Sequence, residues 1–492
     1  MDKIKSLKTT VAKSYFWVGI AHLIQKSAIV ISGIILARIL NPNDFGLIAI
    51  ATTIIAFVGI LGNLGIKDAL IFQREKIKIA ADTVFYINVI LGLLYTSLTF
   101  FLAPYLADFF KSPESKLVIQ VLSFQFILHY LGLTSLALLQ KKFKFFWISV
   151  TTVVSSISSI LITVVLALNN FHVWSLVIGN LSGVLINTIL FFILSPWKPS
   201  QTFDKKVFSQ IFNYGKHLIK SDIFLTAIDQ GDKFVLGRMK GSVDLGYYTL
   251  SYNLANLPAL SISAVVQQVS FPAFSKIRND IKVLRSAYYK NIQFIALLAI
   301  PISVGMIILA PEITKYVFGE KWLPMIPALQ IISVYGCLRS ITWVVHDVIK
   351  AVGKTKLFSR IILFQLLLMA IIIYPLTKSY GMQGTALALT LPVIVQFFIS
   401  LYYGSKIIEE GIKKSLMLLI RISFPSIIMG ISLTVLKYNM TISSIYILLV
   451  IIVVSIFIYF GCAVLFDKSI LLESIDIFKK ITSRKNDQPK QV

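Results

Sequence analysis

The chain has 492 residues, of which 57% are hydrophobic and only 14% charged, and its mean hydropathy is +0.81. These values lie far outside the range of soluble globular proteins. A membrane-spanning segment needs about 20 apolar residues, and only helices or closed barrels satisfy their backbone polar groups within a bilayer. The apolar runs are long and unbroken, which favours helices over barrel strands. We therefore expect an all-α polytopic membrane protein.

About fourteen transmembrane helices are predicted along the chain. The first follows a Lys-rich start, but it is too long for a signal peptide and has Lys26 at its centre, so we expect it to be retained. The predicted helices cover residues 14–40, 43–66, 81–110, 115–139, 145–168, 173–195, 217–239, 243–272, 287–318, 323–349, 357–377, 381–404, 415–436 and 442–466.

The Lys and Arg residues predict the orientation of these helices. Most of the 47 basic residues fall in the loops on the same side as both termini, and cytoplasmic loops carry such an excess. Both termini are therefore expected in the cytoplasm. The net charge of +25 reflects this bias and attraction to anionic lipid headgroups, so membrane lipids are expected partners and nucleic acid is not.

Two nine-residue segments match each other at an offset of 200 residues: RILNPNDFG at 38–46 and RMKGSVDLG at 238–246. The shared positions are Arg38, Asp44 and Gly46 in the first and Arg238, Asp244 and Gly246 in the second. Each segment is predicted to be a tight outer hairpin, after helix 1 and after helix 7. Because six helices separate the copies, they predict two parallel six-helix repeats, a plan found in transporters. Coincidence among apolar segments is the alternative.

The repeat predicts a domain plan. We expect an N-lobe at 1–195, a cytoplasmic linker at 196–216, a C-lobe at 217–404, two further helices at 405–466 and a basic cytoplasmic tail at 467–492. Within the linker, apolar residues at helical spacing predict an interfacial helix, although a plain connector without membrane contact fits equally well.

The stretches ARILNPNDFGLIAIATTIIAFVGILGNLGIKDALIFQRE (37–75) and DKFVLGRMKGSVDLGYYTLSYNLANLP (232–258) resemble signature regions of polysaccharide exporters in the multidrug/oligosaccharidyl-lipid/polysaccharide (MOP) superfamily, nearest the lipopolysaccharide and teichuronic acid exporter branch. This resemblance implies two lobes around a V-shaped cavity and alternating access. It also implies a polyprenyl-diphosphate-linked oligosaccharide as cargo, carried from the inner to the outer leaflet of the bacterial cytoplasmic membrane. Proteins of polysaccharide synthesis and polymerisation are the partners it suggests.

Charged residues inside predicted spans are costly and need a partner, water or a function. Lys26 lies too deep in helix 1 to snorkel and shares a face with His22, which predicts a cavity-lining stripe. We interpret Lys26 as a cavity cation for a diphosphate or an acidic sugar. The alternative is a structural pair with a carboxylate of helix 7.

Helix 7 carries Asp222, Asp229, Asp232 and Lys233 among apolar residues. Asp222, Asp229 and Lys233 share one face, which must contact water or protein. Structural ion pairs and a proton- or sodium-linked switch are both open, as is a shorter helix that leaves these groups at its ends. No other cofactor and no metal site is predicted.

Helix 10 places Arg339, Trp343, His346 and Lys350 on one stripe, with Asp347 adjacent. An Arg can hold a phosphate with two hydrogen bonds while a Trp stacks on a sugar ring, a combination suited to a glycan lipid. The alternative is that the polar residues further along the helix, His346 to Lys350, only mark its cytoplasmic end.

Three observations separate the candidate functions. Predicted spans 1 to 6 hold no central carboxylate, as a cation-coupled multidrug or small-molecule antiporter would need, and Lys26 favours anionic cargo. The short outer loops leave little room for a membrane glycan polymerase or ligase. Cys337 and Cys462 both lie inside predicted spans, which excludes a disulfide framework. We therefore predict a flippase and no enzyme, with the antiporter, the polymerase or ligase, and a non-transporting scaffold as alternatives.

Overall fold

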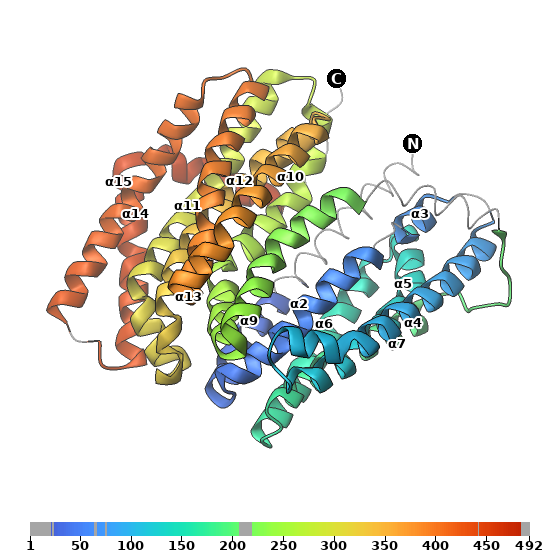
Figure 1. Cartoon of the computed structure of the whole chain (residues 1–492). Coiled ribbons are helices and arrows are strands. Elements are labelled where there is room, and N and C mark those ends of the chain that lie inside the picture. The colour runs from blue at the N-terminus through green and yellow to red at the C-terminus, as the bar shows by residue number, and fades with distance from the viewer. Residues whose placement is uncertain are drawn as a thin grey trace. The chain divides into compact units, whose positions relative to one another are not determined.

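The computed structural model describes residues 21, 24–62, 66–73, 76–205, 219–440 and 442–483, and regular structure in these ranges is helical throughout (Figure 1). A helical segment at 24–39 precedes the labelled helices. The first half of the chain then forms α2 (Pro42–Gly62), α3 (Ile66–Phe72), α4 (Ile77–Phe109), α5 (Ser115–Lys141), α6 (Phe145–Leu168) and α7 (Val173–Leu194). The predicted linker helix lies outside the described residues, apart from 196–205.

The second half of the chain begins with α9 (Ile219–Ala255), a π-helical turn at Pro258–Ser263 and α10 (Ala264–Ile277). Helix α11 (Ile281–Glu312) continues through a π-helical turn at Ile313–Phe318 and a short 3-10 segment at Glu320–Met325. The remaining helices are α12 (Ile326–Ala351), α13 (Thr355–Ile407), α14 (Ile412–Asn439) and α15 (Ile445–Ser483).

Glycines with a positive φ break two of the three longest helical elements, α9 and α13. Gly241 (φ 86°) divides α9, and Gly381 (φ 57°) divides α13. A positive φ costs a glycine little because it has no Cβ. Gly241 falls in the predicted gap between helices 7 and 8, and Gly381 is the first residue of predicted helix 12.

Ten helices of the described residues are long and apolar enough to cross a membrane. Helix α13 is counted among them as one element of 53 residues, and α9, with its charged residues, is not counted. The prediction of an all-helical polytopic membrane protein is confirmed. Its division into two six-helix repeats and two extra helices remains a prediction.

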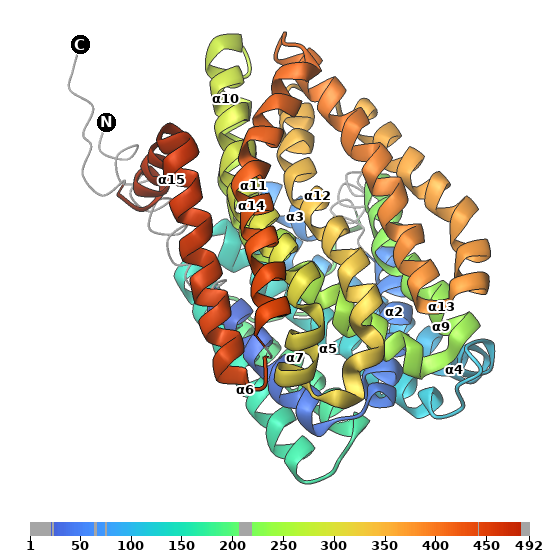
Figure 2. The same cartoon turned by 90° about the vertical axis from the view of Figure 1, so that its left-hand side faces the viewer.

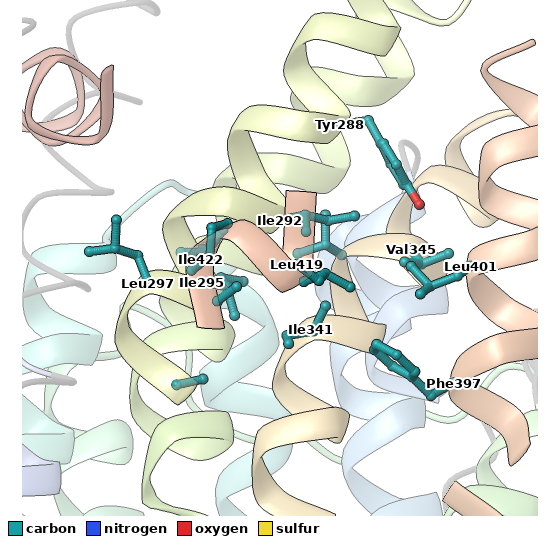
Figure 3. Close-up of a cluster of buried hydrophobic side chains, with 14 of the residues drawn as sticks. Tyr288, Ile292, Ile295, Leu297, Ile341, Val345, Phe397, Leu401, Leu419 and Ile422 are labelled. Carbon is teal, nitrogen blue, oxygen red and sulfur yellow. The ribbon is translucent and has the colours of Figure 1, made fainter. Parts of the chain in front are cut away.

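The chain forms two compact units. The first comprises Met1–Leu250 with Ile373–Thr385, and the second comprises Ser251–Ile372 with Ala386–Val492. In the first unit α4 packs along α5, and α6 packs along α7 (Figure 1). In the second unit α11 contacts α12, α14 and α15 (Figure 2). The main apolar core of the second unit lies among these helices and α13, and it includes Tyr288, Ile341 and Phe397 (Figure 3).

A buried carboxylate ties the segment after α7 to the first turns of α4. The Asp82 side chain is fully buried and accepts hydrogen bonds from the Trp197 indole (2.9 Å), the Ser200 backbone N–H (3.2 Å) and the Thr202 hydroxyl (2.5 Å). The Ser200 hydroxyl donates to it as well. A buried carboxylate is stable only when its oxygens are satisfied in this way. Asp82 therefore fixes the beginning of the predicted linker on the first unit.

The start of α11 gives a prediction of modest size. Asp280 caps this helix, since its carboxylate accepts from the backbone N–H groups of Lys282 and Val283, each at 3.1 Å. We expect Asp280→Ala to lower the free energy of unfolding by about 1 kcal/mol, because two N–H groups of the first turn lose their acceptor. Thermal unfolding of the purified protein in detergent measures this loss. Asp280→Asn, which can still cap, is the control, and equal losses for both variants would contradict the prediction.

Candidate functional site

A pocket of about 380 Å³ lies between α2 and the first half of α9, inside the first unit. Its α2 wall is small or apolar, whereas its α9 wall carries a hydroxyl, a carboxylate and an amide. The lining residues are Ala56, Gly59, Ile60, Leu225, Thr226, Asp229 and Gln230. Groups of these three polar types bind sugar hydroxyls or cations.

Lys233 and Thr53 organise the polar wall of the pocket. The Lys233 ammonium donates to the Asp229 carbonyl oxygen (2.8 Å) and to the Gln230 side-chain oxygen (3.4 Å). The Thr53 hydroxyl donates to the same Gln230 oxygen (3.4 Å), which links α2 to α9. Asp229 and Lys233 lie four residues apart on the face predicted from the sequence, and the Lys233 ammonium contacts the backbone carbonyl of Asp229.

Asp232 is in a different environment from Asp229. Its side chain is fully buried and accepts from the Tyr248 hydroxyl (2.6 Å) and from the Lys233 backbone N–H (2.7 Å). Tyr248 is itself fully buried and lies beyond the Gly241 break. Asp232 therefore joins the two halves of α9.

Lys26 lies on the helical segment at 24–39 and is partly exposed. Its ammonium forms no hydrogen bond or ion pair with another described residue. The neighbouring Gln25 amide donates to the Ser156 hydroxyl of α6 (2.9 Å), which fixes the segment against the first unit. His22 and the side chain of Asp222 lie outside the described residues.

Arg339 of α12 is held by aromatic residues in the second unit. Its Nη1 donates to the hydroxyls of Tyr252 and Tyr335, each at 2.9 Å. The guanidinium carbon lies 5.6 Å from the centre of the Tyr335 ring and 5.1 Å from that of Trp343. Tyr335 and Trp343 flank Arg339 at four-residue spacing on the same helix. We call Tyr252, Tyr335, Arg339 and Trp343 the arginine cage.

The polar residues that follow the arginine cage on α12 contact other side chains of the protein. His346 is buried, with its Nε2 3.3 Å from the Ser400 hydroxyl and 3.2 Å from the Gln396 amide nitrogen. Asp347 pairs with Lys350 at 2.9 Å. The stripe predicted from Arg339 to Lys350 therefore divides into the cage and a separate buried polar network.

The two matching hairpins meet inside the first unit. A Cβ on Gly46 would lie 1.7 Å from the Ser242 carbonyl oxygen, and a Cβ on Gly246 would lie 1.9 Å from the Pro42 carbonyl oxygen. Both contacts obey the offset of 200 residues, so each glycine lies against the same position of the other copy. We call this contact the hairpin crossing. The Asn43 side-chain oxygen also accepts from the Ser242 hydroxyl there.

The remaining hairpin residues differ in their surroundings. Asp44 is buried and accepts from the Asn41 backbone N–H (3.0 Å) at the start of α2. Arg238 lies over the Phe109 ring, 4.9 Å from its centre. Arg38 is exposed, and Asp244 is partly buried.

Comparison with known proteins assigns the family. A family model described as "Polysaccharide biosynthesis protein" matches residues 35–327, which is more than half of the chain. The chain belongs to this polysaccharide biosynthesis family. The match includes both hairpins, so the predicted resemblance to polysaccharide exporters is confirmed.

The names of two relatives agree with this family assignment. The lipopolysaccharide biosynthesis protein WzxC of Escherichia coli is 27% identical over 403 residues, covering 81% of this chain and 81% of WzxC. The teichuronic acid biosynthesis protein TuaB of Bacillus subtilis is 26% identical over 306 residues, covering 61% of this chain and 63% of TuaB.

Solved structures show the fold of this family member. The lipid II flippase MurJ in an inward closed conformation matches with a TM-score of 0.75 and 19% identity, covering 95% of this chain and 99% of MurJ. An inward-facing MATE multidrug transporter of the MOP superfamily matches with a TM-score of 0.59 and 15% identity, covering 82% of this chain and 99% of the transporter. The chain therefore shares its fold with MurJ and with this MATE transporter.

The sequence singled out Arg339, Trp343, Asp229 and the hairpin glycines as candidates. It did not predict which residues surround them. Tyr252 comes from α9 and is far from Arg339 in sequence, so no helical spacing connects them. The anchoring role of Asp82 depends on residues more than a hundred positions away. The only indication of this role in the sequence was the position of Asp82 just inside an apolar run.

Proposed function

We propose that this protein is a flippase that carries a polyprenyl-diphosphate-linked oligosaccharide from the inner to the outer leaflet of the bacterial cytoplasmic membrane by alternating access. The observation that carries the proposal is the family match over residues 35–327, combined with a fold shared with a lipid II flippase over 95% of the chain. Both termini would lie in the cytoplasm, as the Lys and Arg distribution predicts, and the lobes would follow the predicted limits at 1–195 and 217–404.

The arginine cage supplies chemistry suited to the diphosphate. A guanidinium binds phosphate through paired hydrogen bonds, and this binding requires the guanidinium to be held in a fixed orientation. The hydroxyls of Tyr252 and Tyr335 hold Nη1 while being neutral themselves, so they orient the guanidinium without cancelling its charge. Trp343 stacks beside it and, in this proposal, supports the arginine as well as the sugar.

The first unit supplies a second cation and a polar pocket. Lys26 would contribute positive charge toward the diphosphate, and the sequence predicts His22 on the same helical face. In the pocket, sugar hydroxyls would form hydrogen bonds with Thr226, Asp229 and Gln230. Coupling to H⁺ or Na⁺ through Asp222 or Asp229 is part of the proposal, as is delivery of the cargo to proteins of polysaccharide synthesis and polymerisation.

The experiment that tests the proposal measures which side of the membrane the lipid-linked glycan occupies. After depletion of the protein, the glycan lipids are extracted from sealed vesicles treated with a glycosidase that cannot cross the bilayer. We expect one protected, cytoplasmic-facing species to accumulate and wild-type protein to reverse this. An unchanged pool with normal sidedness would refute the flippase and favour the antiporter.

A further inference from the structure

Two corners between consecutive helices have the same backbone and different residues. The first, between α5 and α6, is residues 142–144, and the second, between α12 and α13, is residues 352–354. Their first residues have φ, ψ of −87°, 9° and −82°, 7°, and their last residues −82°, 45° and −83°, 47°. In each corner the N–H of the last residue donates to the carbonyl five positions earlier, at 2.9 Å in the first and 3.1 Å in the second. The two corners are therefore built alike.

The middle residue of this corner has a positive φ, a conformation that favours glycine. Gly353 occupies this position in the second corner (φ 80°), whereas Phe143 occupies it in the first (φ 54°). A Cβ makes a positive φ costly, and a bulky residue there is uncommon. Among the described non-glycine residues with a positive φ, Phe143 alone has an apolar side chain. The first corner thus keeps an aromatic ring where glycine would be more stable.

The Phe143 ring lies at the protein surface. Its side chain is 45% exposed, and its ring centre is 6.1 Å from that of Phe145 in the same segment. Phe146 and Trp147, on the first turn of α6, are 38% and 43% exposed, and their ring centres are 5.3 Å apart. Three exposed rings therefore occupy one short segment. We call residues 142–147 the aromatic corner.

Positive charge accompanies these rings. Lys142 is exposed and Lys144 is partly exposed. Lys141 has an internal role, since its ammonium donates to backbone carbonyl oxygens at the end of α3 at 2.8 and 3.2 Å. Helices α4 and α5 pack together and are joined at their other ends, so the start of α4 lies at this end of the first unit as well. Lys76 and Lys78 are exposed there.

Helices α5 and α6 are both long and apolar enough to cross a membrane, so the aromatic corner lies where the chain leaves the bilayer. Aromatic rings are enriched at this level, and Lys residues beside it are attracted to anionic headgroups. We propose that the aromatic corner is a docking site for anionic lipid of the cytoplasmic leaflet. Phe143 and Trp147 insert among the lipids, and Lys142 and Lys144 contact headgroup phosphates. This inference rests on the proposed orientation of the termini and does not depend on the cargo.

Replacement of Phe143 by glycine should have two effects of opposite sign. In neutral detergent without lipid, the thermal unfolding temperature should rise by about 1–2 °C, because glycine adopts the positive φ at little cost. Phosphatidylglycerol should raise the unfolding temperature of the wild type by several degrees more than phosphatidylcholine does, and Phe143→Gly should lose most of this gain. Phe143→Ala removes the ring but keeps a Cβ, so it should lose the same gain without the rise in detergent.

The second corner provides a matched control for charge. Lys142→Gln/Lys144→Gln should also lose most of the phosphatidylglycerol gain. Lys354→Gln/Lys356→Gln removes two exposed lysines at the α12–α13 corner and should keep the wild-type gain. Equal losses in the two double variants would overturn the proposal, because the lipid would then respond to net charge and not to the aromatic corner.

The remaining outcomes are equally decisive. A phosphatidylglycerol gain that survives in Phe143→Gly and Phe143→Ala overturns the lipid site. A polyprenyl phosphate at the same mole fraction is the probe for cargo, and if it alone produces a gain that depends on the corner, the corner receives cargo and not membrane lipid. If no lipid produces such a gain and the variants slow flipping in cells but not in liposomes, the corner binds a protein instead. The thermal measurements do not depend on transport, so a corner-dependent lipid gain in a protein that moves no glycan supports the lipid site and refutes only the flippase.

Discussion

Replacement of Asp82 by alanine is expected to lower the free energy of unfolding by about 3 kcal/mol, because it leaves the buried Trp197 indole N–H and the partly buried Ser200 backbone N–H without an acceptor. The Ser200 and Thr202 hydroxyls also lose their partner, but they lie nearer to solvent and can bond to water. The change is measured as the thermal unfolding temperature of the purified protein in detergent, together with its abundance in the membrane.

Asparagine at position 82 is the matched variant. Its amide oxygen can still accept from Trp197 and Ser200 N–H, and its amide nitrogen can donate to the two hydroxyls, so we expect a loss of only about 1 kcal/mol. Thr202→Ala, which removes one exposed donor, should cost less again. If Asp82→Ala were as stable as the wild type, the buried hydrogen bonds would not anchor the segment after α7.

Replacement of Arg339 by alanine is expected to slow glycan flipping by roughly tenfold to a hundredfold, the equivalent of about 1.5–3 kcal/mol for hydrogen bonds to a charged group. Arg339→Lys keeps the charge but loses the planar fork and most of the stacking on Trp343 and Tyr335, so it should remain well below wild type. The measurement is the outward-facing fraction of the lipid-linked glycan with time.

Substitutions in the arginine cage should reduce flipping to different extents. Tyr252→Phe removes one of the two hydrogen bonds to Nη1 and keeps the ring, so its effect should be smaller than that of Arg339→Lys. Arg360→Ala, an exposed arginine at the start of α13, is the control for loss of a positive charge. Wild-type flipping by a stable Arg339→Ala protein would remove the cage from the transport site.

The sequence by itself determined the class of this protein and most of its helices. Apolar runs long enough to cross a bilayer predicted α6 and α7 almost to the residue, because in lipid every backbone polar group must be satisfied within the helix. Interruptions such as Asn41–Pro42 and Lys240–Gly241 marked the breaks for local reasons, since turn-forming residues and a positive φ act within a few positions. The repeat of Gly46 at Gly246 was equally visible.

Only the tertiary structure decided which polar groups work together. Asp229 and Asp232 are three residues apart, yet one lines a pocket and the other is sealed against Tyr248. Arg339 and His346 lie on one predicted stripe, yet the first has aromatic partners and the second a buried amide and hydroxyl. A helical period states which face a residue occupies, but the partner on that face comes from distant chain segments. The hairpins likewise matched as sequences, and their mutual contact emerged only when the fold brought Gly46 against Ser242.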